Sequence, residues 1–452
     1  MRRQLNSRLA SLFAATSLML VGTGCSNHKD KATFAFANTQ TKFFEYGETR
    51  RIGIVTSGVA EIFFTVPEGW SAAEGGSSYF VVTAPDAQDA QAELSGTLGI
   101  KAVSAYDELD TLRYTIGVEI KPAIDLSAAA TANSYIVTRP DVRYKFKATV
   151  KGNGTESIDP FDAALVWKSS TQLIDYVDYF DGYVYFNTVS KTENGAARLR
   201  EGNAVIAVRD AEENILWSWH IWSTDYTPDP DERFMSRNLG AMSESNATDL
   251  DKLRSFGLYY QWGRKDPFIY ADAYDHTKDH DMFYQSSQYR VAYVTVVETG
   301  AETGTAAYAA AHPLSFIVGT EKGSYDWLQS PDTALWGPVK TVNDPCPAGW
   351  RVPSAADFTA MTPTGAAFDY GTMFATPDSG DQYWAAAGRR SYYNGILTNS
   401  TVAAGRTPDC YGLYWTTDAE GADSRAFHFD AAGHGVQPHH RAAGLSVRCV
   451  RE

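Results

Sequence analysis

Short runs in which apolar and polar residues alternate dominate the N-terminal half of the chain. They predict strands at residues 51–55, 61–66, 79–83, 114–120, 134–137, 144–150, 164–167, 183–186 and 203–208. Turn signals separate these runs, and Asp181-Gly182 is a turn of the hairpin type. Several short strands with regular turns and no helical heptads favour antiparallel sandwiches. The pattern therefore predicts two β-rich domains, at residues 32–122 and 123–224.

The second domain ends in a strand with large apolar residues on both faces. One face of residues 215–222 carries Leu216, Ser218, His220 and Trp222. The other face carries Trp217, Trp219 and Ile221. A strand of this kind is buried on both faces or lies at a domain junction. In that setting we expect His220 to be a hydrogen-bonded structural residue and not a ligand.

The N-terminus has the features of an export signal. Arginines at positions 2, 3 and 8 precede an apolar stretch that is too short to remain as a membrane span, so residues 1–24 are expected to be a cleaved signal peptide. The small residues directly before Cys25 resemble the lipobox of bacterial lipoproteins. That resemblance implies acylation of Cys25, palmitate included, and anchoring in the cell outer membrane through a polar tether at residues 25–31. The alternative is an ordinary signal peptide with an incidental cysteine.

Charge narrows the choice of partners. The whole chain has a formal charge of −15, and without the three signal arginines 36 basic residues (39 less 3) face 54 acidic ones, a net charge near −18. Nucleic acids and anionic membrane surfaces are therefore poor partners, which leaves the lipid anchor as the expected contact with a membrane. Aromatic residues make up 13% of the chain, which suits β-sheet cores and also sugar- or protein-binding surfaces.

The C-terminal half carries an ordered set of motifs. They lie at residues 234–240, 257–264, 343–353, 412–417 and 444–450. This set resembles the Fibrobacter succinogenes major paralogous domain of Bacteroidetes surface lipoproteins. The resemblance implies that residues 225–452 form an α+β, C-type-lectin-like domain with short helices and adjacent termini, and Ser354 with Asp357 suits a helix start. The segments at 66–70 and 82–85 resemble the Ig-like modules of such proteins, so the expected fold is mainly β, with Ig-like sandwiches before a lectin-like domain.

Three cysteines remain after Cys25. An exported chain meets an oxidising compartment, so one disulfide and one odd thiol are expected. We predict that Cys346 pairs with Cys449, which closes a loop of roughly 100 residues and stabilises the fold by about 4–5 kcal/mol. A bond between Cys410 and Cys449, or three free thiols, are the alternatives.

The sequence contains none of the catalytic signatures that we sought. A zinc-protease motif, a nucleophile elbow and a phosphate loop are all missing, and so are the sugar-reading motifs of calcium-dependent lectins. Residues 272–281 form an acidic–histidine run, which we interpret as a solvated loop and not as a cation site. We therefore predict no catalytic residues, no cofactor and no metal site.

Candidate ligand-binding residues come from the late loops of the lectin-like domain. In lectin-like folds these loops present the variable face, and aromatic and amide side chains suit sugar stacking or adaptable protein contacts. The predicted ligand-binding residues are Tyr392, Tyr393, Asn394, His434, His439, His440 and Arg441. The alternative is that the two tyrosines lie half in the core. Trp350, Trp384 and Trp415 are assigned to the core and not to the site.

These features predict a non-catalytic cell-surface lipoprotein that presents a lectin-like domain for adhesion, with a glycan or a host or bacterial surface protein as partner. One alternative is a structural or tip subunit of a fimbria, assembled with other fimbrial subunits by strand exchange after processing at Arg50-Arg51. Another is a glycan-binding accessory of a polysaccharide-use system. An oxidase that uses Cys410 is a further alternative, which unchanged activity in Cys410→Ser would remove.

Overall fold

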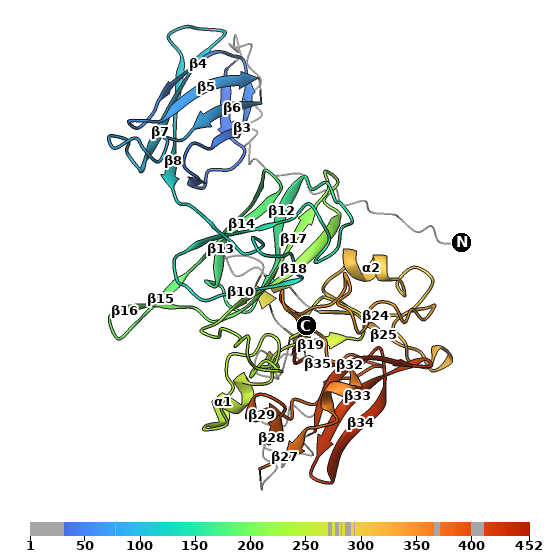
Figure 1. Cartoon of the computed structure of the whole chain (residues 1–452). Helices are drawn as coiled ribbons and strands as arrows, with labels where there is room; N and C mark the ends of the chain where they lie inside the picture. The colour runs from blue at the N-terminus through green and yellow to red at the C-terminus, as the bar shows by residue number, and fades with distance from the viewer. Residues whose placement is uncertain are drawn as a thin grey trace, which may run out of the picture. The chain divides into compact units, whose positions relative to one another are not determined.

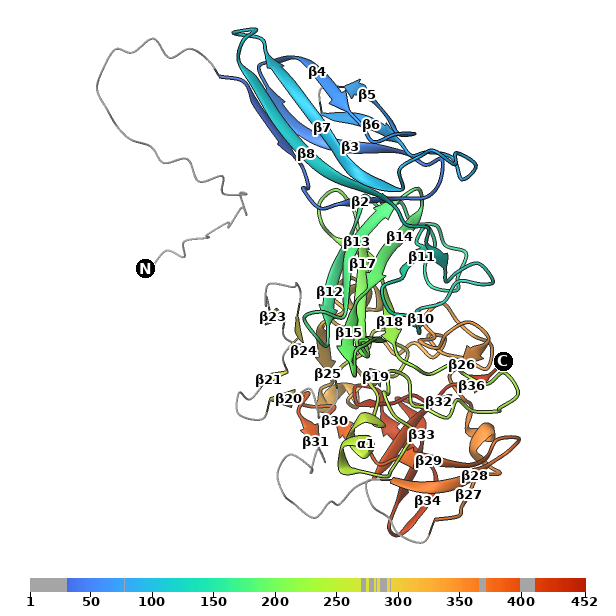
Figure 2. The same cartoon turned by 90° about the vertical axis from the view of Figure 1, so that its left-hand side faces the viewer.

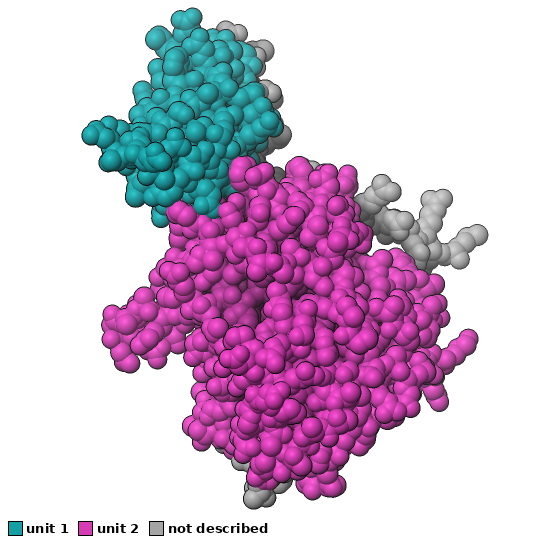
Figure 3. Space-filling model, viewed as in Figure 1, with its two compact units in different colours: residues 1–120 teal, residues 121–452 magenta. Residues whose placement is uncertain are grey.

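The computed structural model describes residues 31–76, 78–269, 274–275, 280–281, 283–284, 291–292, 294–365, 371–398 and 411–452. The protein is mainly β: of the residues described, 46% lie in strands and 5% in helices. The chain divides into two compact units, residues 1–120 and 121–452 (Figure 3). The expected signal peptide, Cys25 and Cys410 lie outside the described residues. In the described part of the chain, no helix is long and apolar enough to cross a membrane.

The first unit is a β-sandwich (blue in Figure 1). One sheet has the order β1-β3-β6-β5, with bounds β1 Thr33–Phe36, β3 Thr49–Ser57, β6 Tyr79–Thr83 and β5 Ser71–Gly76. The other has the order β2-β8-β7-β4, with bounds β2 Lys42–Phe44, β8 Thr111–Ile120, β7 Ser95–Ser104 and β4 Val59–Thr65. Alternate residues of β7 and β8 are buried, as expected for strands with one face on a core.

The core of this sandwich is apolar and aromatic. Phe44, Phe80 and Leu98 are completely buried, and the indole of Trp70 donates a hydrogen bond to the carbonyl of Glu93 at 2.7 Å. Arg50 is also buried, within β3, beside Glu48 at 3.5 Å. Processing at the Arg50-Arg51 pair would therefore require β3 to leave the sheet.

The second unit begins with another pair of sheets, most of whose strands are teal to green in Figure 1. One sheet has the order β13-β14-β11-β9, with bounds β13 Ile174–Phe180, β14 Tyr183–Thr188, β11 Arg143–Lys147 and β9 Ile124–Asp125. The other has the order β10-β18-β17-β12-β22-β23, with bounds β10 Ser134–Val137, β18 Ile215–Ser223, β17 Gly202–Arg209, β12 Asp162–Lys168, β22 Phe283–Tyr284 and β23 Val291–Ala292. A separate hairpin joins β15 (Ser190–Glu193) to β16 (Ala196–Leu199).

Two sequence predictions about these sheets can be compared with the structure. Asp181 and Gly182 both have positive φ (47° and 81°) and join β13 to β14, so the predicted hairpin turn is confirmed. The expectation of purely antiparallel sheets is wrong, because β2 with β8, β9 with β11 and β10 with β18 pair in parallel. A strand that enters a sheet from a longer connection, and not through a hairpin, is free to run parallel to its neighbour.

Strand β18 is buried on both faces, as predicted. Figure 2 shows β12, β17 and β18 side by side, which agrees with their pairing. Trp219 and Ile221 pack in one hydrophobic cluster, whereas Trp222 packs in another. His220 lies between Ser134 Oγ (3.1 Å from Nδ1) and Asn203 Oδ1 (2.8 Å from Nε2). Burial lowers the pKa of His220 to about 3, so the histidine is neutral and structural, as expected.

The C-terminal part of the second unit is built on a seven-stranded sheet, whose strands β32, β33 and β34 are orange to red in Figure 1. Its order is β31-β30-β35-β32-β33-β34, with β19 also paired to β35, and the bounds are β31 Leu397–Thr398, β30 Arg389–Arg390, β35 Gly444–Ser446, β32 Gly412–Glu420, β33 Asp423–Asp430, β34 Gly433–His440 and β19 Tyr259–Gln261. The smaller sheets contain β27 Thr362–Pro363, β28 Gly371–Thr376 and β29 Gly380–Ala385; β24 Thr295–Glu298 and β25 Ser315–Val318; β20 Tyr274–Asp275 and β21 His280–Asp281; and β26 Trp350–Arg351 and β36 Val450–Arg451.

Helices in this part are short. They are α1 Asp249–Arg254, α2 Ala306–Ala311 and the 3₁₀ turns η2 Glu321–Gly323 and η3 Ala355–Phe358. The predicted helix start is confirmed, because Ser354 and Asp357 form a capping box at η3. The two ends of this part meet in a bridge between Phe234 and Val450.

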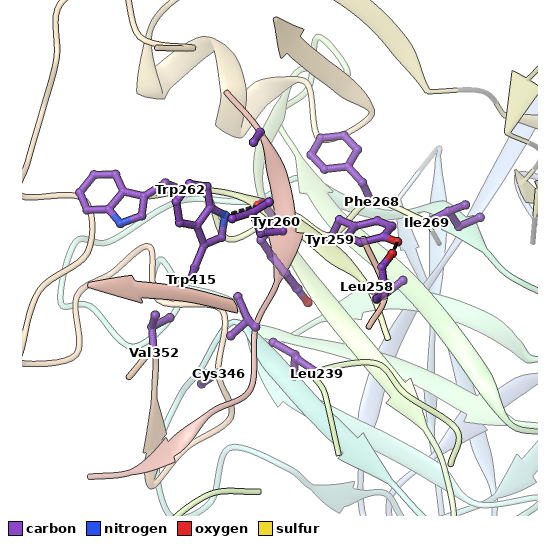
Figure 4. Close-up of a cluster of buried hydrophobic side chains, with 14 of the residues drawn as sticks. Leu239, Leu258, Tyr259, Tyr260, Trp262, Phe268, Ile269, Cys346, Val352 and Trp415 are labelled. Carbon is purple, nitrogen blue, oxygen red and sulfur yellow. Dashed lines mark hydrogen bonds between the residues drawn. The ribbon is translucent and has the colours of Figure 1, made fainter. Parts of the chain in front are cut away.

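Residues on both sides of position 225 share one hydrophobic core. Trp167 and Trp222 belong to the same buried cluster as Trp262 and Trp415 (Figure 4 labels the last two). The predicted domains 123–224 and 225–452 thus fall within a single compact unit. Cys346 and Cys449 form a disulfide, the pairing expected from the sequence. The tryptophans assigned to the core, at positions 350, 384 and 415, are all buried.

Candidate ligand-binding surface

A tight turn at residues 391–396 presents two adjacent tyrosines. The backbone N–H of Ser391 donates to the carbonyl of Ile396 at 2.9 Å, and the N–H of Ile396 donates to Asn394 Oδ1 at 3.1 Å. The carbonyl of Tyr392 accepts a hydrogen bond from the N–H of Gly319 at 2.9 Å. As a result Tyr392 is half-buried, while 58% of Tyr393 is exposed.

Four aromatic side chains gather at this turn, and we name Tyr325, Tyr392, Tyr393 and His440 the tyrosine–histidine cluster. The ring centroid of Tyr392 lies 4.8 Å from that of Tyr325, 5.4 Å from that of Tyr393 and 4.5 Å from that of His440. These three contacts are edge-to-face, the arrangement that aromatic quadrupoles favour. The guanidinium of Arg389 lies 5.3 Å from the centroid of the Tyr392 ring. The cluster is thus a packed set of rings with Tyr393 at its exposed side.

Tyr325 was not among the residues predicted from the sequence. It joins the cluster because Ser324 and Tyr325 both adopt left-handed backbone conformations, with φ of 53° and 55°. Gly319 allows this path, because a Cβ at that position would lie 2.4 Å from the Cα of Tyr325. No local pattern in the segment 319–325 identifies Tyr325 as a ligand contact.

Adjacent histidines of β34 have different surroundings. His440 Nδ1 lies 2.7 Å from Asp423 Oδ1, which orients its ring in the cluster. Burial lowers the pKa of His439 to about 4, and the neighbouring Arg389, His428 and His440 lower it further. His439 is therefore neutral at pH 7. Among the described residues its Nε2 atom has no hydrogen-bond partner.

Arg441 is completely buried, so its predicted place among the ligand contacts is wrong. The guanidinium donates to Asp326 Oδ2 at 3.1 Å and to Ser424 Oγ at 2.9 Å, and it also donates to the carbonyls of Gly421 and Asp423, each at 3.0 Å. It also lies 4.8 Å from the ring centroid of Trp262. Because its donors are used within the protein, Arg441 stabilises the fold next to the cluster and does not contact a ligand.

The remaining predicted residues have different positions. Asn394 uses its side-chain oxygen to hold the turn. His434 is exposed near the start of β34, where its ring lies 5.6 Å from Phe374 and 6.3 Å from Phe427, and no ring contact places it in the cluster. The structure thus brings Tyr392, Tyr393 and His440 together.

The chemistry available at this surface is stacking and hydrogen bonding. Tyrosine rings offer apolar faces and hydroxyls with little conformational freedom to lose, which suits both sugars and protein surfaces. Among the residues described, no group of three or more His, Cys, Asp or Glu side chains is placed to hold a metal ion. Most of the acidic–histidine run at 272–281 lies outside the described residues.

Comparisons with known proteins do not identify a family for this chain. No protein-family model and no curated protein sequence matches the chain. Among solved structures, the chain is similar to the D00-D0 domain of intimin, with 12% identity and a TM-score of 0.18 over 42% of this chain and 96% of that one. It is also similar to a titin Ig tandem, with 7% identity and a TM-score of 0.16 over 43% of this chain and 98% of that one. A protocadherin gamma B7 fragment matches with 11% identity and a TM-score of 0.17 over 45% of this chain and 53% of that one. Likeness at this level supports no conclusion about function.

Proposed function

We propose that this chain is a non-catalytic cell-envelope lipoprotein that binds a glycan or a surface protein through the tyrosine–histidine cluster. The observation that carries the proposal is Tyr393, a large aromatic side chain that is 58% exposed on a turn held by backbone hydrogen bonds. Exposed aromatic residues on a rigid support are typical anchors of binding surfaces.

The support below the turn favours this role. The carbonyl of Tyr325 accepts a hydrogen bond from the N–H of Ala442 at 3.2 Å, directly after the buried Arg441. Tyr392 is fixed through Gly319, and His440 through Asp423. Three of the four rings are therefore held by separate interactions, so a ligand would meet a surface that is already ordered, which reduces the entropy lost on binding.

The lectin-like character of residues 225–452 is part of the same proposal. It rests on the motif resemblance to the Fibrobacter succinogenes major paralogous domain. The adjacent ends of this part, at Phe234 and Val450, and its short helices support it. Anchoring through Cys25 rests on the lipobox resemblance. Replacing Cys25 by Ala would move the protein from the outer-membrane fraction to the soluble fraction, whereas unchanged fractionation would contradict lipidation.

The binding experiment uses residues 26–452, produced under oxidising conditions and applied to glycan and host-protein arrays with and without calcium. We expect Tyr393→Ala to weaken a positive interaction by roughly thirtyfold, since an aromatic anchor contributes about 2 kcal/mol or more. Tyr46→Ala is the matched control, because Tyr46 is also exposed (41%) but lies in the first unit. Absence of binding by a folded protein, or equal losses in the two variants, would contradict the proposal.

A further inference from the structure

A cavity of about 280 Å³ lies in the second unit, beside the tip of α1. It forms where the end of β12 and the start of β17 meet the helix and the segment before β19. Pockets for drug-sized ligands span roughly 300–1,000 Å³, so this cavity, just below that range, has room only for a small molecule. Its lining residues differ from those of the tyrosine–histidine cluster.

The floor of the cavity is apolar. Trp167, Met242 and Leu258 line it, and all three are buried in the shared core. Leu250 lines the cavity from α1, and 61% of that side chain is exposed. The exposed side chain of Leu250 therefore offers an apolar surface on which the C–H face of a sugar ring can pack, above the buried floor.

The rim is polar and carries balanced charges. Arg254 Nη2 lies 2.5 Å from Glu201 Oε2, and both side chains remain partly exposed (32% and 22%). Their backbones are fixed, because the carbonyl of Arg254 accepts hydrogen bonds from the N–H groups of Met242 (2.8 Å) and Ser243 (3.2 Å), and Glu201 directly precedes β17. A guanidinium beside a carboxylate offers donors and acceptors together without a net charge.

Two serines complete the polar side. Ser169 Oγ accepts a hydrogen bond from the N–H of Asn203 at 3.0 Å, which leaves its own proton available to donate. Ser170 lines the same side and is partly exposed. Gly202 also lines the cavity, and a Cβ there would lie 2.4 Å from Ser169 Oγ, so the absence of a side chain keeps this wall open.

We infer that this cavity binds a neutral, hydroxyl-rich ligand of the size of one monosaccharide unit. The hydroxyls would donate to Glu201 and accept from Arg254, while the apolar ring face lies against Leu250. A charged ligand gains no net Coulomb attraction here, because the Glu201–Arg254 pair presents one charge of each sign. The site is additional to the proposed function and does not depend on it.

The test measures binding of free neutral monosaccharides (glucose, galactose, mannose, fucose and N-acetylglucosamine) to residues 26–452 by saturation-transfer NMR. Inorganic phosphate and glucuronate serve as charged comparators. Ser170→Phe fills the cavity and is expected to abolish binding. Glu201→Gln is expected to weaken binding by about tenfold, the effect of losing one hydrogen bond to a charged group. Glu193→Gln is the matched control, because Glu193 is also paired with a cation (Lys191, 3.1 Å) but does not line this cavity.

The outcomes separate the two sites. All three variants must first show unchanged thermal melting. The cavity site is then established if a neutral sugar binds saturably, Ser170→Phe and Glu201→Gln reduce that binding, and Glu193→Gln does not. Failure of every neutral sugar to bind, or stronger binding of a charged comparator, would overturn it. Sugar binding that Tyr393→Ala removes and Ser170→Phe leaves intact would place the sugar on the tyrosine–histidine cluster. That result would overturn the cavity proposal and sustain the proposed function.

Discussion

Replacing Arg441 by Met should strongly destabilise the second unit. Arg441 and Asp326 are both completely buried, and the four hydrogen bonds of the guanidinium reach two separate segments of the chain, at Asp326 and at residues 421–424. Methionine keeps much of the aliphatic length over Trp262 but leaves the carboxylate of Asp326 without its positive partner. Burial already raises the pKa of Asp326, and Arg441 opposes that rise.

The expected magnitude follows from this geometry. Removing one partner of a buried ion pair typically costs about 3–5 kcal/mol, because an uncompensated charge stays in the interior. A typical domain has only about 5–15 kcal/mol of stability, so the loss would be a large fraction of the total. Asp326→Asn combined with Arg441→Met should lose less than the sum of the two single variants, by about 1–3 kcal/mol, because the double variant buries no charge.

Urea denaturation followed by tryptophan fluorescence would measure these differences, since Trp262 packs directly against Arg441. Lys191→Met is the control, as Lys191 is an exposed cation in an ion pair and should change stability by less than about 1 kcal/mol. Additive effects of Asp326→Asn and Arg441→Met would refute the argument, because independent losses would mean that the two side chains do not compensate each other.

Three further predictions concern separate features of the second unit. Replacing both Cys346 and Cys449 by Ser should cost about 4–5 kcal/mol, and equal melting temperatures with and without reductant would contradict this. The pKa of His439 is lowered to about 4 in the fold, so below pH 6.5 the unfolded chain binds the proton more readily. The free energy of unfolding should therefore fall by as much as about 3 kcal/mol as the pH drops from 6.5 toward 4. His439→Gln should reduce this pH dependence in thermal melts, and an unchanged dependence would exclude His439 as its source. Gly319→Ala should weaken binding at the tyrosine–histidine cluster and lower the melting temperature, because its Cβ would clash with the backbone of Tyr325; wild-type behaviour in both assays would oppose this role.

Local patterns in the sequence predicted much of the fold. β18 was visible because its alternation places large residues on both faces within nine consecutive positions. The turn at Asp181-Gly182 was visible because two residues with positive φ have a strong residue preference. Such features depend on neighbours in the chain, which a single sequence records directly.

The candidate surface was less predictable, because it depends on distant contacts. Arg441 follows two histidines in a polar segment, and charged residues are seldom fully buried, so the sequence predicted an exposed side chain. Its partner Asp326 is 115 positions away, so nothing near Arg441 indicates its burial. Tyr325 joins Tyr392 in the same way, from a different segment of the chain.

The core shared across position 225 limits how this protein can be divided or recombined. A fragment that begins at residue 225 lacks Trp167 and Trp222, which are buried in the same cluster as Trp262 and Trp415. Such a fragment would expose a large apolar surface and would be prone to aggregation. Gene fusions that exchange the C-terminal part between proteins would therefore yield a soluble product only if the transferred cassette begins near residue 121, with the preceding sheets included.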